Sequence, residues 1–310
     1  MGANRNAILA YLQQVPELPA GAVQALRILQ DPDVSMDRVG PAIAHDPGMT
    51  ATILRLANSA AYAPISPIKT IQDAVIRLGR DTVKSIVVAV ALGPAAKAPV
   101  PGYGLEAGEL LEHSMAVARA TVHLGKRLKR TLPPAAFTAG LLHNVGKLVL
   151  GNFLAINPHQ IMTLARDERL PFDAAERLLF GIDHAEAGAL LLARWQLPEE
   201  ITLPVRWHHR PAQCPEEHRT VARLIHLADH CCITHGVGAG VDGESYPPDS
   251  TVADGEGYTP EIGDLVFADV RGEVKPLKEF FGIKAKEVRV EVTHAVATPQ
   301  SVGGPKRAFR

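Results

Sequence analysis

Apolar and polar positions alternate with helical spacing through the first ninety residues. One apolar stripe follows the order i, i+4, i+7, i+8 and i+11, and it comprises Met49, Ile53, Leu56, Ala57 and Ala60. Two shorter stripes follow, at Ile71, Ala74, Val75 and Leu78 and at Val83, Ile86, Val87 and Val90. This spacing predicts a series of amphipathic helices. The β-branched run IVVAV at 86–90 also fits a buried strand, but its helical neighbours and the lack of a partner strand favour a helix.

Segments rich in Gly and Pro divide the chain. GPAAKAPVPGYG at 93–104 predicts a linker, and helical periodicity returns between 106 and 234. From 236 onward Gly, Pro, Ser and acidic residues dominate, with one further helix expected around 272–282 that docks on the core. The expected organisation is all-α, with an N-terminal helical part over 1–97, a linker over 98–105, a second helical part over 106–236 and a poorly patterned extension over 237–310.

Composition and charge narrow the classes of function. The 310 residues are 46% hydrophobic and 21% charged, and 32 Lys and Arg nearly balance 33 Asp and Glu, for a net charge of −1. A chain with this balance has no general attraction to nucleic acid or anionic lipid, so neither is expected as a partner. The N-terminus lacks the pattern of a secretory signal, and the longest uncharged apolar run is too short to span a bilayer. Three Cys cannot form an even disulfide framework. These features predict a cytoplasmic protein.

Several well-known catalytic and phosphate-binding motifs are not found. GLLHNVGKL at 140–148 superficially resembles a phosphate-binding loop. Its glycines are six residues apart rather than five, and Leu148 stands where a Mg²⁺-binding hydroxyl is required. The sequence has no GxGxxG after a predicted strand, no HExxH and no GxSxG.

Histidine is the unusual feature, with 13 in the chain. Several occur in or at the end of predicted helices, together with one amide and one acid, and the set is His113, His143, Asn144, His184, His208, His209 and Asp229. Helical bundles can cluster metal ligands in this way, and neutral imidazole suits Fe, Mn, Zn or Ni. Lys147 lies one turn after His143, where its ammonium could contact a phosphate. Gly140 and Gly146 would let a neighbouring helix or ligand approach closely. The alternative is that each imidazole hydrogen-bonds locally and no ion binds.

Five segments of the second half carry a family resemblance: LEHSMAVA, FTAGLLHNVGKLVL, GIDHAEAGALLLARWQLPEEI, RWHHRP and ARLIHLAD. In this order they resemble the HD superfamily of metal-dependent phosphohydrolases, and more narrowly its HDOD branch (HD-related output domain). DPGMTATILRLANSA and ISPIKTIQDAVIRLG are similar to the helical half that precedes the HD-like half in HDOD proteins. The resemblance runs from about residue 15 to 234. It implies two packed helical subdomains, of which the second is an HD-like bundle.

The resemblance also implies a two-metal site and assigns its ligands. One metal would take His113, His143, Asn144 and Asp229, and the other His184, His208 and His209. In HD phosphohydrolases the position of Asn144 holds an Asp that commonly bridges both ions. An amide carries no charge and bridges two cations poorly. The change is expected to lower metal affinity or activity by at least about 10–100-fold, or roughly 1.4–2.8 kcal/mol. The open alternatives are a retained divalent ion (Fe, Mn or Zn) and an inherited set of hydrogen-bonded residues without an ion.

The function implied by the resemblance is regulatory, because HDOD proteins are signalling and interaction modules without an established general catalytic activity. We expect a non-catalytic module of bacterial signal transduction that acts through a protein partner, such as a protein of cyclic di-GMP turnover. The alternative is a metal-dependent phosphohydrolase acting on a nucleotide or cyclic dinucleotide, with Lys147 steadying the phosphate. Arg55, Asn58 and Ser59 match a motif typical of the N-terminal half, and they form either a partner surface or a capped helix end.

Overall fold

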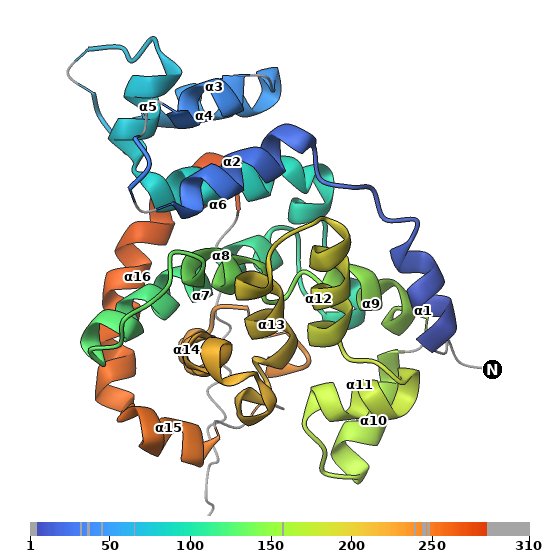
Figure 1. Ribbon diagram of the computed structural model, residues 1–310. Coiled ribbons are helices and arrows are strands. Elements are labelled where there is room, and N and C mark those ends of the chain that lie inside the picture. Colours follow the sequence, from blue (N-terminus) through green and yellow to red (C-terminus); the bar gives the residue numbers. More distant parts are fainter. Residues whose placement is uncertain are drawn as a thin grey trace, which may run out of the picture.

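Helices account for the whole ordered architecture (Figure 1). The computed structural model describes residues 5–283 except 32, 36, 37, 45, 65, 157, 239, 244, 245, 247 and 248. Within these residues no β-strand forms, and one isolated bridge pairs Val100 with Leu105. The all-α expectation is therefore confirmed.

A layer at the top of the molecule in Figure 1 consists of α2 (Ala20–Gln30), α3 (Val39–Ala44), α4 (Pro47–Ala57), α5 (Ile71–Leu78) and α6 (Arg80–Ala91). The first helix, α1 (Arg5–Leu12), lies apart from this layer, at the right of the same view. Asp46 caps α4 by accepting from the Met49 N–H, and Thr70 caps α5 in the same way, as helix N-termini require. The run at 86–90 is helical and lies in α6. In contrast to its neighbours in sequence, α1 packs on α9 and α12 of the second part.

The Gly- and Pro-rich segment between the two parts is ordered and packed. It contains the 3₁₀ helices η2 (Gly93–Lys97) and η3 (Pro101–Tyr103), and η3 lies against α9. A Cβ on Gly102 would lie 2.5 Å from the Gly151 carbonyl oxygen, so the two backbones can meet only through glycine. The Tyr103 side chain is fully buried. The linker of the sequence analysis is thus part of the core.

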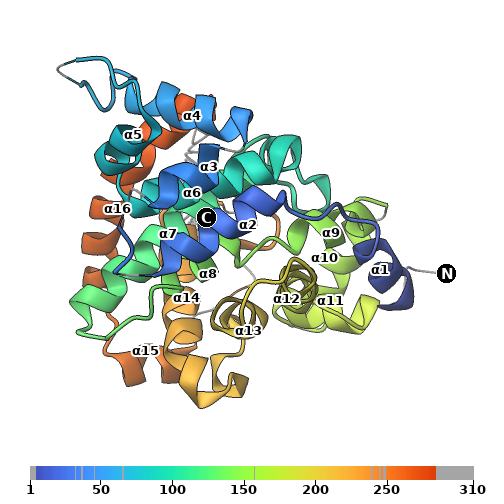
Figure 2. The same cartoon turned by 45° about the horizontal axis from the view of Figure 1, so that its top comes forward.

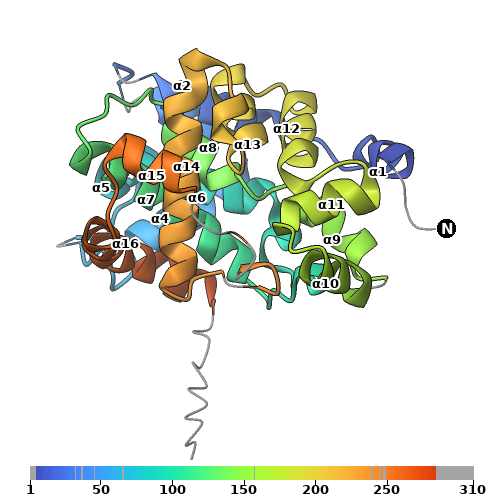
Figure 3. The same ribbon diagram turned by 90° about the horizontal axis from the view of Figure 1, so that it is seen from below.

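The second part surrounds two long helices that cross the middle of the molecule, α7 and α14 (Figures 1 and 3). Its helices are α7 (Glu109–Arg127), α8 (Ala136–Leu142), α9 (Lys147–Leu154), α10 (Pro158–Asp167), α11 (Phe172–Phe180), α12 (His184–Arg194), α13 (Glu199–Trp207), η4 (Pro211–Gln213) and α14 (Glu216–Thr234). α7 packs against α8 and α14, and α13 packs against α8, α12 and α14. These helices surround the candidate site.

The extension after 236 contains more structure than its composition predicts. It forms α15 (Ser250–Glu256) and α16 (Pro260–Phe281). α16 includes the predicted 272–282 helix but begins twelve residues earlier, and it runs along α7 (Figure 2). The remainder of the predicted extension, 284–310, lies outside the described residues.

None of the described helices alone is both long enough and apolar enough to cross a bilayer. The stretches Ala136–Leu154 and Pro158–Asp167 pass this criterion only as a pair, and they are bent by 110° relative to each other.

Candidate metal centre

The structure gathers the six predicted His and Asp residues into two adjacent groups. We call His113, His143 and Asp229 the Asp229 cluster, and His184, His208 and His209 the His184 cluster. In each cluster the candidate ligand atoms lie within 4.8 Å of one another. The His143 ring joins the two clusters, because its centroid lies 5.2 Å from those of both His113 and His208. This is the division of residues that the family resemblance implied.

The Asp229 cluster is buried and contains one carboxylate. Asp229 Oδ1 lies 3.0 Å from His113 Nε2 and 3.7 Å from His143 Nε2. His113 comes from the second turn of α7, Asp229 from α14, and His143 directly follows α8. All three side chains are at most 6% exposed.

The His184 cluster contains imidazoles only. His184 is the first residue of α12, and His208 and His209 follow the end of α13. The Nε2 atoms of His184 and His209 are 2.9 Å apart, and the rings of His208 and His209 have centroids 3.9 Å apart. No acidic side chain belongs to this cluster.

The outer nitrogen of most of these rings is held by a backbone carbonyl. Nδ1 of His143 donates to Gly140, that of His208 to Val205 and that of His113 to Val237, at 2.8, 2.7 and 3.0 Å. A carbonyl only accepts, so each Nδ1 carries the proton and each neutral ring directs a lone pair from Nε2. Metal-binding histidines in proteins are oriented in this way.

Burial and neighbouring rings set the charges. Burial lowers the pKa of His143, and burial together with adjacent imidazoles lowers the pKa of His208 and His209 further. Although burial opposes it, the positive charge that His113 and His143 carry in their protonated forms holds the pKa of Asp229 well below its ordinary value. At His184, in contrast, the adjacent Glu176 raises the pKa of the ring although burial opposes it. Neutral rings are thus favoured at His143, His208 and His209, and neutral imidazole and ionised carboxylate are the forms that bind a divalent cation.

Unpartnered polar atoms test whether a metal fits. Five buried atoms of the predicted set have no hydrogen-bond partner in the described part of the chain: His113 Nε2, His143 Nε2, His208 Nε2, Asn144 Oδ1 and Asp229 Oδ1. Such atoms are rare in folded proteins because each costs about 1–3 kcal/mol when unsatisfied. Although His113 Nε2 and Asp229 Oδ1 are close, they do not have the alignment of a hydrogen bond. The donor set fits a divalent ion that imidazole, amide and carboxylate can share, such as Fe, Mn or Zn.

Two local features of the sequence fix the positions of the ligands. Asp183 caps α12 by accepting from the Glu186 N–H at 2.7 Å, so that the helix begins at His184. Gly146 lies directly under α12, where a Cβ would lie 1.9 Å from the His184 carbonyl oxygen. A Cβ on Gly140 would similarly lie 3.0 Å from the Cα atom of Ala118 in α7. Both glycines thus serve close helix packing, one of the two uses expected from the sequence.

Lys147 is not free to contact a phosphate in this conformation. Its ammonium donates to Asp242 at 2.6 Å, and both side chains are at most 4% exposed. Three other described residues after α14 also contact the clusters. The Val237 carbonyl accepts from His113, Gly238 lies against the His113 ring, and Tyr246 stacks on His209 with centroids 4.3 Å apart. We call Val237, Gly238, Asp242 and Tyr246 the cover residues, because together they contact both clusters and Lys147.

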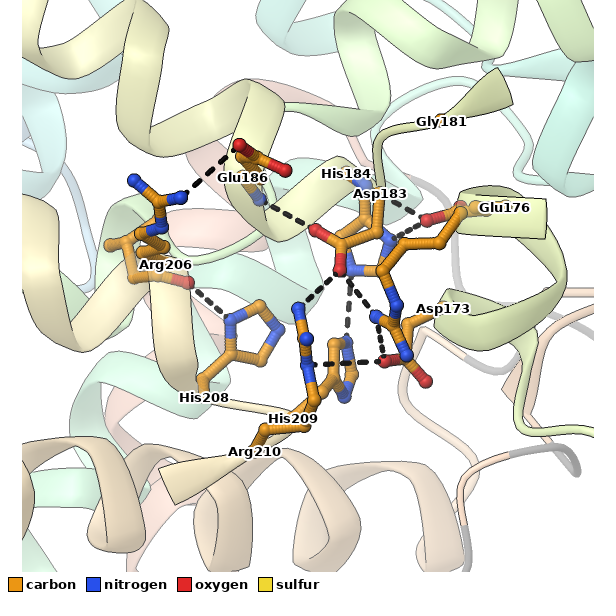
Figure 4. Close-up of polar contacts among 12 residues, drawn as sticks. Asp173, Glu176, Gly181, Asp183, His184, Glu186, Arg206, His208, His209 and Arg210 are labelled. Carbon is orange, nitrogen blue, oxygen red and sulfur yellow. Dashed lines mark hydrogen bonds and ion pairs between the residues drawn. The ribbon is translucent and has the colours of Figure 1, made fainter. Parts of the chain in front are cut away.

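A polar network behind the His184 cluster was not predicted (Figure 4). Glu176 accepts a hydrogen bond from His184 Nδ1 at 2.8 Å, and Asp183 accepts from Arg210 at 2.8 Å. Glu176 had a signal in the sequence, because it shares one face of its helix with Phe172 and Phe180. An acid on an apolar face is buried, and it therefore needs a partner.

The predicted partner-surface residues of the N-terminal part have contacts within the chain. Asn58 accepts from the Ile68 N–H and donates to its carbonyl, at 2.8 and 2.9 Å, and so closes the loop between α4 and α5. The Arg55 guanidinium lies 5.4 Å from the centre of the Phe280 ring. The Ser59 hydroxyl is buried and has no hydrogen-bond partner among the described residues. These contacts give Arg55 and Asn58 a structural role, and a partner surface stays a prediction.

Comparison with known proteins relates the whole arrangement to one family. The HDOD domain model matches residues 15–211. The chain resembles the crystal structure of an HDOD domain protein of unknown function from Geobacter sulfurreducens, with 28% identity, a TM-score of 0.64 and coverage of 88% of this chain and 97% of that one. It also resembles a protein from Marinobacter aquaeolei VT8 provisionally assigned to signal transduction, with 25% identity, a TM-score of 0.70 and coverage of 91% of this chain and 61% of that one. A third similar structure is that of a protein from Shewanella amazonensis SB2B provisionally described as a phosphohydrolase, with 26% identity, a TM-score of 0.59 and coverage of 88% of this chain and 97% of that one.

A curated relative is longer than this chain. An uncharacterized protein of Treponema pallidum is 25% identical over 222 residues, which are 70% of this chain and 42% of that protein. The chain thus spans less than half the length of this relative.

Proposed function

The chain belongs to the HDOD family, and on that premise we propose that it is a regulatory module of signal transduction with a buried metal centre. It acts through a protein partner rather than by turnover of a substrate. The observation that carries this proposal is the set of contacts that the cover residues Val237, Gly238, Asp242 and Tyr246 make with the two clusters and with Lys147.

The cover residues contact His113, Lys147 and His209, which a phosphodiester bound at the clusters would have to reach. The Val237 carbonyl accepts from His113, Asp242 pairs with Lys147 and Tyr246 stacks on His209. A hydrolase needs a ligand position that water and substrate can reach. Here the Nε2 atoms of His113, His143 and His208 are all buried, which supports a role in binding or structure.

The charge of the site supports the same proposal. Two divalent ions bring four positive charges, whereas Asp229 is the one acidic residue in the two clusters. Asn144 adds an oxygen without charge, and the acid closest behind the His184 cluster, Glu176, contacts the outer nitrogen of its histidine. The water-activating ability of paired metals depends on anions that hold them close together. Retention of metal without efficient hydrolysis is the outcome that this arrangement favours.

The two clusters and the family resemblance together support an assignment of ligands. The Asp229 cluster, with Asn144, would hold one ion, and the His184 cluster would hold the other. A divalent ion bound there would neutralise Asp229, stabilise the helix packing and offer Lewis-acid chemistry. The side chains themselves orient the lone pairs and exclude water from the centre.

The proposed partner is a signalling protein, such as one that makes or degrades cyclic di-GMP. A net charge of −1 gives no general attraction to nucleic acid. The similarity to a protein provisionally assigned to signal transduction supports this class of partner.

A metal-dependent phosphohydrolase of nucleotides or cyclic dinucleotides is the second candidate. The five unpartnered donor atoms in two adjacent clusters favour it, because such pairs of sites serve phosphoryl chemistry in other proteins. In that case Tyr246 and Asp242 must move away from the clusters, and Lys147 must exchange Asp242 for a phosphate.

Metal analysis of the purified protein, followed by assays with bis(p-nitrophenyl) phosphate and cyclic di-GMP, tests the proposal. We expect stoichiometric Fe, Mn or Zn in the wild type and in the control His159→Ala, which changes an exposed histidine of α10. We expect metal loss in His143→Ala and no hydrolysis by any of the three proteins. Hydrolysis by the wild type that disappears in His143→Ala would overturn the regulatory proposal in favour of the enzyme. A wild type without metal would overturn the metal centre.

A further inference from the structure

One carboxylate behind the His184 cluster has an unusual set of partners. Glu176 of α11 is fully buried. It accepts hydrogen bonds from the Tyr103 hydroxyl at 2.5 Å and from the His184 backbone N–H and Nδ1, both at 2.8 Å. Within the described part of the chain no Lys or Arg pairs with it. Its neighbour Asp183 differs, because Arg177 and Arg210 both contact that carboxylate.

A buried carboxylate without a cationic partner requires positive charge nearby. Moving an ion of this size out of water costs several kcal/mol unless it is compensated. The hydroxyl of Tyr103 and the backbone N–H of His184 supply dipoles, but neither supplies charge. The compensating charge must therefore lie on the His184 ring or beyond it, at the Nε2 atom that faces the cluster.

His184 is also the one cluster histidine whose Nδ1 contacts a carboxylate. The corresponding atoms of His113, His143 and His208 contact backbone carbonyls. A carboxylate makes an imidazole a stronger base and a better ligand than a carbonyl does. The His184 cluster has no acidic member, so it has the greater need of such support.

We propose that Glu176 is a positioning residue for a divalent ion in the His184 cluster, and that it supplies through His184 the negative charge that the cluster lacks. This inference rests on the proposed metal centre. Glu176 fixes the orientation and the protonated Nδ1 of His184, while Tyr103 holds the carboxylate from the other side. Asp183 and Arg210 separately anchor the turn that follows His209, as Figure 4 shows.

The inference is tested by titrating the metal-free full chain with Co²⁺ and recording the visible absorption of each bound equivalent. For the wild type we expect two equivalents, and for His184→Ala we expect one. Glu176→Gln preserves the shape and removes the charge. It is expected to weaken one equivalent by about 10–100-fold, to shift the absorption band of that equivalent and to leave the other unchanged.

A matched control is Glu256→Gln, which converts another buried carboxylate, paired with Arg130 and Arg223. It is expected to change stability but neither Co²⁺ affinity nor spectrum. If Glu176→Gln does not fold, Glu176→Asp retains the charge but withdraws it from Nδ1, and it should weaken the same equivalent. Co²⁺ binding by Glu176→Gln that matches the wild type in affinity and spectrum would overturn this inference alone. Absence of Co²⁺ binding by the wild type would overturn the metal centre itself.

Discussion

At the scale of single residues, Asn144 decides how much charge the centre can balance. Its side chain is 1% exposed, and Oδ1 has no partner among the described residues. An Asp at this position would add a negative charge between His143 and the start of α9. Without metal that charge would be buried and unpaired, whereas a divalent ion would compensate it.

Asn144→Asp is therefore expected to lower the stability of the metal-free protein and to increase the stability gained on metal binding. The metal-free variant should be less stable than the wild type by about 1–3 kcal/mol. Saturating Zn²⁺ or Mn²⁺ should raise its melting temperature by more than that of the wild type, because tighter binding to the folded state adds stability. Scanning calorimetry with and without metal measures both effects. Asn6→Asp, the same change at an exposed position of α1, should show neither effect. An equal metal-dependent gain in Asn144→Asp and the wild type would contradict the prediction.

Lys84 gives a pH prediction outside the metal centre. It is 2% exposed, and its ammonium donates to the Pro134 carbonyl at 3.2 Å. Burial lowers the pKa of this group to about 8. The unfolded chain keeps the proton up to a pKa of about 10.4, so deprotonation favours the folded state between these two values.

The wild type should accordingly gain up to about 3 kcal/mol of stability relative to Lys84→Met as the pH rises from 8 to 10.5. Urea unfolding at several pH values measures the difference between the two proteins. Lys275→Met replaces a lysine that is 74% exposed and should give a difference that does not change with pH. If the stability difference between the wild type and Lys84→Met also stays constant with pH, the lowered pKa assigned to Lys84 is refuted.

The candidate site shows which functional residues can be predicted from the sequence and which cannot. Seven positions could be named from the sequence, because helix ends and the family pattern mark them. The roles of Glu176 and Asp242 could not, because each depends on contacts between distant segments. Glu176 meets Tyr103 across 73 residues and Asp242 meets Lys147 across 95. Periodicity describes neighbours in sequence and contains no information about such pairs.

At the scale of elements, the start of α9 and the first turns of α12 meet at a close backbone contact. Gly146 lies where a Cβ would be 1.9 Å from the His184 carbonyl oxygen and 2.6 Å from the Gly188 nitrogen. Backbone atoms cannot yield as a flexible side chain can, so the two helices would have to separate.

Gly146→Ala is expected to lower stability by about 3 kcal/mol or more. The urea midpoint should fall while the slope of the transition stays constant. Gly272→Ala is a matched control, because a Cβ there meets nothing within 4 Å in the middle of α16. That substitution should stabilise by up to about 1 kcal/mol, since alanine is the better helix former. Similar midpoints for the two variants would show that the crossing tolerates a methyl group.

Most helices could be predicted from periodicity, and the exceptions have a common cause. α4, α5 and α6 follow the apolar stripes closely, including the β-branched run in α6. α15 was not predicted, because its sequence STVADGE has one large apolar residue, Val252, and its position depends on a cap by Asp249 and on contacts with α14. Packing rather than local preference determines this helix.

At the scale of the whole molecule, α16 connects the two helical parts. Its buried face, which includes Val266, Val270 and Leu277, lies on α7 and α14 of the second part. Its last turn reaches the first part, where Arg55 lies over Phe280 and Lys97 over Phe281. The apolar core is continuous across both parts. We therefore expect the described chain to unfold as one cooperative unit.

Leu277→Ala tests this expectation, because Leu277 is 1% exposed and Leu265 on the same helix is 54% exposed. Truncation of the buried leucine should cost about 2–5 kcal/mol, whereas Leu265→Ala should change stability by less than about 0.5 kcal/mol. Circular dichroism follows all the helices, and fluorescence follows Trp195 and Trp207 in the second part. If α16 joins the parts, the two signals should shift together in Leu277→Ala and keep one midpoint, since a two-state unit gives the same transition by every probe. Separate midpoints in the variant and in the wild type would mean that the two helical parts unfold independently, and the continuous core would then not act as a single cooperative unit.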